Sequence, residues 1–98
     1  MKKFYFTDAS VQKSVSLIIS KMNTDGVPSL EITSLTGSIH LPSGGNIGTQ
    51  KAIVSLTSDK KLIISRDDKK NESPYEYPLD HSTLQWIKIN KIPVHLKL

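Results

Sequence analysis

The 98-residue sequence contains no cysteine, which excludes disulfide bonds, cysteine-ligated zinc and thiol catalysis. It also lacks any run of about eighteen apolar residues, the length that a transmembrane helix needs. The Met1-Lys2-Lys3 start resembles the first part of a signal peptide, but Asp8 and Gln12 interrupt the apolar stretch that should follow. We therefore expect a cytoplasmic protein that has no membrane partner and is stabilised by its own core or by a partner.

Arginine is scarce, since Arg66 is the only arginine among the 13 basic residues, and 9 acidic residues leave a net charge of +4. Proteins that read base edges favour the planar arginine fork, which lysine does not replace. The abundance of lysine, isoleucine and asparagine is the bias that A- and T-rich codons produce. We interpret it as the mark of an AT-rich bacterial or phage genome, and the modest charge as a contribution to solubility.

The residues that are present indicate one small α+β domain covering residues 1–98. Apolar side chains recur at helical spacing near the start of the chain, and Asn23, Gly26 and Pro28 then end the pattern. This spacing predicts a helix across most of residues 10–22, with an apolar face of Val11, Val15, Ile18 and Met22. A strand is the alternative for this segment, because β-branched residues and serines are poor helix formers.

Short segments rich in β-branched residues follow, each bounded by Gly, Pro, Asn or Asp. They predict strands at residues 30–35, 38–41, 52–57, 61–66 and 84–90, with a last edge strand at 94–98. Residues 3–6 are expected to form a short strand or an anchored N-terminal arm. The expected fold is an N-terminal helix packed on an antiparallel sheet of about five or six strands, and the alternative is an all-β, partly closed barrel. The helix face should meet Ile32, Ile53, Ile63 and Trp86 or their neighbours.

No motif in the sequence identifies a reaction. The glycine-rich stretch at 42–50 lacks the lysine that a phosphate-binding loop requires, and His40, His81 and His95 follow no metal-ligand spacing. The run Asp80-His81-Ser82 is typical of a turn or a helix cap, since catalytic triads assemble from separated positions. We expect no enzymatic activity, no catalytic residue, no metal and no cofactor.

Aromatic residues beside lysines are the one feature that suggests a nucleic-acid ligand. In single-strand binders, aromatic rings on strands stack on bases while lysines follow the phosphates. The candidate contacts are Phe4, Tyr75, Tyr77, Trp86, Lys69, Lys70 and Lys88. A domain in which only 6% of residues are aromatic needs most of these rings for its core. We therefore expect Trp86 to be buried and nucleic-acid binding to be weak and nonspecific.

Small size, short strands with exposable edges and the missing catalytic motif favour a non-enzymatic protein-binding module of the inhibitor, immunity or accessory-subunit type. The alternative is a nucleic-acid-binding protein that uses lysines and sheet aromatics. The expected partner is a protein, and a homodimer through an edge strand is a further hypothesis. The lysine distribution discriminates between the two classes, because clustering on one face favours nucleic acid and scatter favours a protein partner or solubility.

Overall fold

The computed structural model describes residues 8–47, 51–66 and 73–94. The elements follow one another as α1 (Asp8–Asp25), β1 (Ser29–Thr36), β2 (Ile39–His40), β3 (Asn46–Ile47), β4 (Lys51–Thr57), β5 (Lys61–Arg66), β6 (Tyr75–Pro78) and α2 (His81–Ile89). This arrangement confirms the predicted α+β class with an N-terminal helix and an antiparallel sheet. Among the described residues the strands do not close into a barrel.

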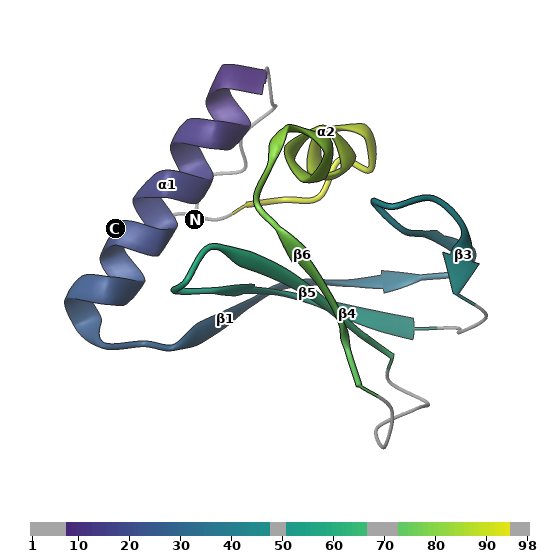
Figure 1. Cartoon of the computed structure of the whole chain (residues 1–98), viewed down its shortest axis with the longest axis horizontal. Coiled ribbons are helices and arrows are strands. Elements are labelled where there is room, and N and C mark those ends of the chain that lie inside the picture. Colours follow the sequence, from purple (N-terminus) through teal and green to yellow (C-terminus); the bar gives the residue numbers. More distant parts are fainter. Residues whose placement is uncertain (1–7, 48–50, 67–72, 95–98) are drawn as a thin grey trace.

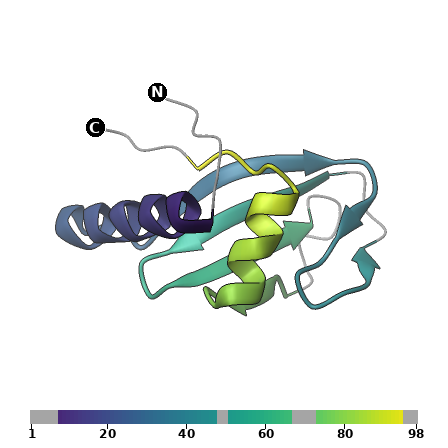
Figure 2. The ribbon, with the colours of Figure 1, turned by 90° about the horizontal axis from the view of Figure 1, so that it is seen from above.

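Four of the six strands form one antiparallel sheet in the order β1-β4-β5-β6, and β2 and β3 form a separate hairpin. Both helices lie on the same side of this sheet (Figures 1 and 2), and α1 contacts α2. The opposite side carries no helix in the part of the chain that is described. The molecule is thus two layers, of which the helical layer covers one sheet face.

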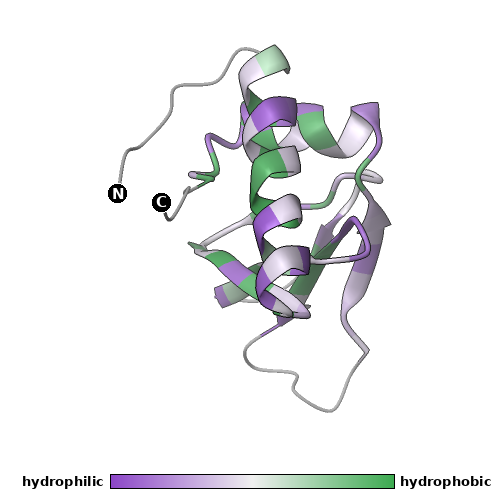
Figure 3. Ribbon diagram, turned by 90° about the vertical axis from the view of Figure 1, so that its left-hand side faces the viewer, coloured by the Kyte–Doolittle hydropathy of each residue, from purple (hydrophilic) through white to green (hydrophobic). Residues whose placement is uncertain are grey.

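The predicted N-terminal helix is confirmed, and its core-facing residues are buried: Val11, Val15, Ile18, Ile19 and Met22. It ends where Gly26 takes a φ of 71°, which a residue without Cβ adopts at little cost. The amide of Val27 then donates to the Met22 carbonyl at 2.8 Å and satisfies one of the last carbonyls of the helix. Figure 3, which looks onto α1, shows a hydrophobic middle between more hydrophilic turns.

The predicted strand at 84–90 is wrong, because this segment belongs to the helix α2. Asp80 starts the helix, since its Oδ1 accepts the Thr83 amide at 3.0 Å. Thr83, Trp86 and Ile87 are buried at the helical spacing of three and four residues. The alternation of Ile87 and Ile89 with polar residues misled the sequence-based prediction, because it resembles a strand over so short a segment.

For two of the four residues expected to meet the helix face, the structure places their neighbours there instead. Ile53 and Ile63 are only half-buried and lie on the sheet face away from the helices, whereas Trp86 is buried and Ile32 packs against the core as predicted. The face under the helices is formed by fully buried neighbours: Ala52, Val54, Leu56, Leu62 and Ile64. Consecutive residues in β4 and β5 are apolar, so alternation in the sequence does not show which set faces the helices.

The remaining strand predictions have mixed outcomes. β1, β4 and β5 confirm the predicted strands, and β2 is shorter than the segment predicted at 38–41. Two short strands, β3 and β6, were not predicted. Residues 3–6 and 95–98 lie outside the described part, and Val94 is buried but belongs to no strand.

Asp80→Ala should lower the melting temperature at neutral pH, because it removes the cap of α2. The hydrogen bond from the Thr83 amide holds the pKa of Asp80 below its ordinary value of 3.8. The unfolded chain therefore binds a proton at Asp80 more readily than the folded chain does. The stability that the carboxylate contributes is thus present above pH 3.8, and it is lost as the pH falls through the lower pKa of the folded state.

Thermal unfolding followed by circular dichroism, at neutral pH and well below pH 3.8, measures this effect. The difference between wild type and Asp80→Ala should shrink at the lower pH, and Asp80→Asn, which keeps a capping oxygen that does not titrate, is the matched control. Equal melting temperatures at neutral pH would show that Asp80 does not cap α2.

Candidate functional site

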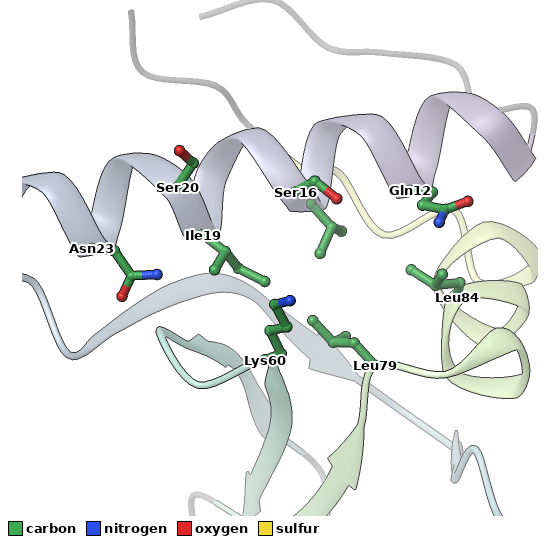
Figure 4. Close-up of a pocket in the computed structure, with 9 residues that line it drawn as sticks. Gln12, Ser16, Ile19, Ser20, Asn23, Lys60, Leu79 and Leu84 are labelled. Atoms are coloured by element: carbon green, nitrogen blue, oxygen red, sulfur yellow. The ribbon is translucent and has the colours of Figure 1, made fainter.

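A groove of about 460 Å³ opens between α1, the β4–β5 turn and the start of α2 (Figure 4). Its volume lies within the range of roughly 300–1,000 Å³ that is common for ligand sites. The groove is lined by Gln12, Val15, Ser16, Ile19, Ser20 and Asn23 from α1, Lys60 from the turn, and Leu79 and Leu84 from the β6–α2 segment. Every one of these residues lies in the described part of the chain.

The groove has an apolar floor and a polar rim. Val15 and Ile19 of α1 are buried, and Leu79 and Leu84 pack, partly buried, against the core. The polar rim follows one flank of α1 at successive spacings of four, four and three residues, as Gln12, Ser16, Ser20 and Asn23, all exposed. Such a surface can contact an apolar group at its floor and form hydrogen bonds with polar groups at its rim.

Lys60 occupies a backbone conformation that favours glycine. Its φ is 64°. Lys60 is the last residue of the turn that begins at Thr57, and its amide closes this turn by donating to the Thr57 carbonyl at 3.2 Å. An L-residue in this left-handed region costs about 1 kcal/mol more than glycine. The Lys60 carbonyl also accepts the Leu79 amide at 3.2 Å, so the backbone is held on both sides. Figure 4 shows the amino group directed toward α1.

Among the described residues, Lys60 is the only charged one that lines the groove. The neighbouring carboxylates are engaged elsewhere: Asp59 lies 3.7 Å from the Lys61 amino group, and Asp80 caps α2. The Thr57 hydroxyl, as a hydrogen-bond donor, holds the pKa of Asp59 below its ordinary value of 3.8. Within the described residues no carboxylate pairs with Lys60, so the groove presents one uncompensated positive charge.

The lining residues offer hydrogen-bonding groups and apolar contacts. Ser16 and Ser20 supply hydroxyls, and no histidine or carboxylate of the described residues lines the groove. Across the described residues no three His, Asp or Glu side chains gather into a metal site. The Asp80-His81-Ser82 run forms the start of α2, where Asp80 acts as the cap that the sequence indicated.

The candidate nucleic-acid contacts that are described do not form one exposed aromatic surface. Trp86 is 6% exposed and its Nε1 donates to the His40 carbonyl at 3.0 Å. Tyr75 and Tyr77 pair with Ile64 and Leu62, and are therefore directed toward the helix-covered face, half-buried. Lys88 is half-buried on α2. Phe4, Lys69 and Lys70 lie outside the described residues.

The described basic residues are distributed over different parts of the fold. They lie on α1 (Lys13 and Lys21), at the β4–β5 turn (Lys60 and Lys61), at the opposite end of the same strands (Lys51 and Arg66), and at the end of α2 (Lys88 and Lys91). One of them, Lys21, is paired with Asp25 at 3.3 Å. Scatter of this kind favours a protein partner or solubility over a nucleic-acid track.

Sequence reasoning missed the groove. The signal available was the polar row on α1, where Gln12, Ser16, Ser20 and Asn23 share a flank without any charge. In the sequence these serines indicate only a low helix propensity. Lys60, Leu79 and Leu84 reach the site through tertiary structure, which no local pattern indicates.

No protein-family model, no curated protein and no solved structure matches the chain. None of the helices in the described ranges is long and apolar enough to cross a membrane.

Trp86 should report whether nucleic acid binds. Because its ring is buried and its Nε1 is bonded to His40, the emission should be blue-shifted and should not change when a single-stranded oligonucleotide is added. Fluorescence titration at two salt concentrations makes the measurement, since each neutralised phosphate releases counterions and steepens the salt dependence. Strong quenching by submicromolar oligonucleotide at moderate salt would favour the nucleic-acid function instead.

Proposed function

We propose that this protein is a small non-enzymatic protein-binding module, of the inhibitor, immunity or accessory-subunit type, that holds a segment of its partner in the groove beside α1. The observation that carries the proposal is the combination of an apolar floor, from Val15, Ile19, Leu79 and Leu84, with a rim of exposed hydrogen-bonding side chains. An apolar centre with a polar rim is the usual anatomy of protein interfaces.

The rim is available for a partner. The side chains of Gln12 and Asn23 make no hydrogen bond with any described residue, and both are exposed. A partner segment that reaches the floor therefore meets amide groups that it can use without displacing internal bonds. These amides favour an occupant with both polar and apolar groups, as a peptide has.

The edge strand β1 supports a second mode of protein association. β1 ends the sheet and pairs only with β4 in the described part of the chain. An eight-residue edge without proline can accept another strand. A homodimer through this edge remains a prediction, and it leaves the groove open because the groove lies on the helical layer.

A photocrosslinking experiment in the host cell tests the proposal. p-Benzoylphenylalanine replaces Ser16, which lines the groove, or Lys21, an exposed residue of the same helix that does not line it. The Ser16 position should give a defined protein adduct and the Lys21 position should give little. Adding Ser20→Trp, which fills the groove, should remove the adduct while the protein remains folded by circular dichroism.

Equal adducts at both positions, or an adduct unchanged by Ser20→Trp, would show that no partner occupies the groove. A nucleic acid that co-purifies with the protein and resists moderate salt would favour the alternative class.

A further inference from the structure

We infer that the partner segment carries an acidic side chain beside an aliphatic one, with its carboxylate on Lys60 and its aliphatic group on the leucines of the groove. This inference rests on the proposed protein-binding function and adds the chemistry of the partner. It follows from three properties of the groove: its charge, its layout and the backbone at Lys60.

No described carboxylate compensates the charge of the groove. Lys60 is the only charged residue among the described ones that line it, and no described carboxylate forms an ion pair with it. Its neighbour Lys61 differs, since Asp59 lies 3.7 Å from the Lys61 amino group. An anionic occupant gains attraction at Lys60 without breaking an existing pair, and a cationic occupant is repelled.

The layout places the charge of the groove beside its apolar floor. Figure 4 shows the Lys60 amino group between Ile19 and Leu79, while Leu84 lies farther along the groove, toward Gln12. An acidic side chain on Lys60 would therefore lie next to an aliphatic side chain packed against Leu79 and Leu84.

The backbone at Lys60 is fixed, which limits where its side chain can carry the charge. Two hydrogen bonds, to Thr57 and from Leu79, hold the residue at a φ of 64° where glycine is favoured. A lysine kept at a strained position is consistent with use of its side chain. A charge on a fixed backbone also loses less entropy on binding than one on a mobile loop.

Titrations of the full-length, ¹⁵N-labelled protein followed by amide chemical shifts test the inference. The probes are N-acetyl-Leu-Glu-Leu-amide and its neutral isostere N-acetyl-Leu-Gln-Leu-amide, whose blocked ends carry no charge. The Glu peptide should bind about three- to tenfold more tightly, as expected for one partly exposed ion pair with a hydrogen bond. The shifts should centre on Ser16, Ser20 and Leu79.

Lys60→Gln should remove the preference for the Glu peptide. Lys61→Gln, the matched control, should keep it, because Lys61 lies on the sheet face away from the helices and is paired with Asp59. Lys60→Gly also removes the charge and suits the positive φ, so it keeps the test decisive if Lys60→Gln unfolds the turn.

Equal binding of the two peptides, or equal loss in the Lys60 and Lys61 variants, would overturn the inference. Shifts in the groove with sodium octanoate but with neither peptide would also overturn it, and would assign the groove to free amphiphilic carboxylates. A groove-specific protein adduct at Ser16 combined with no Glu preference would reject only the acidic segment and leave the protein-binding function standing.

Discussion

The burial of one face of the β4–β5 pair is the constraint on which the rest of the structure depends. Val54 and Leu56 on β4 and Leu62 and Ile64 on β5 are fully buried. The apolar surface of these four side chains must be removed from water. In a short chain without disulfides, the two helices provide this cover. Both helices consequently lie on one side of the sheet, and the other side is left to half-buried isoleucines among serines and threonines.

The groove is a consequence of covering a sheet with two helices of different length and origin. α1 extends over 18 residues and α2 over 9, so the shorter helix leaves part of the flank of α1 uncovered. The turn between β4 and β5 and the link into α2 meet at this gap, where the Leu79 amide donates to the Lys60 carbonyl. One backbone hydrogen bond thus links Lys60, which supplies the charge of the groove, to Leu79 of its apolar floor. The groove is therefore formed by contacts that also hold the turn against the β6–α2 segment.

Local sequence patterns predicted the elements in which apolar residues recur at one regular spacing. α1 was predictable because Val11, Val15, Ile18 and Met22 repeat over three turns and Gly26 ends them. α2 was not, because nine residues allow both a strand-like alternation and a helical spacing, and only the Asp80 cap separates the two. The facing of β4 and β5 was not predictable either, since their apolar residues are consecutive.

The groove lay beyond prediction for a different reason. Its residues come from α1, from the β4–β5 turn and from the α2 region, at positions 12–23, 60, 79 and 84. Their proximity depends on how the helices pack, which the sequence specifies only through the whole core. The candidate residues that the sequence did suggest were chosen for their chemical type, and the described aromatic ones serve the core instead: Trp86 and, in part, Tyr75 and Tyr77.

The groove exists because the helices cover one particular face of the sheet. A matched pair of truncations measures which face is covered. Ile64→Ala removes a fully buried side chain beneath the helices, and Ile63→Ala removes its half-buried neighbour on the other face. Denaturant unfolding should show that Ile64→Ala lowers the free energy of unfolding by about 2–5 kcal/mol and Ile63→Ala by clearly less. Equal losses, or a larger loss at Ile63, would contradict the arrangement that creates the groove.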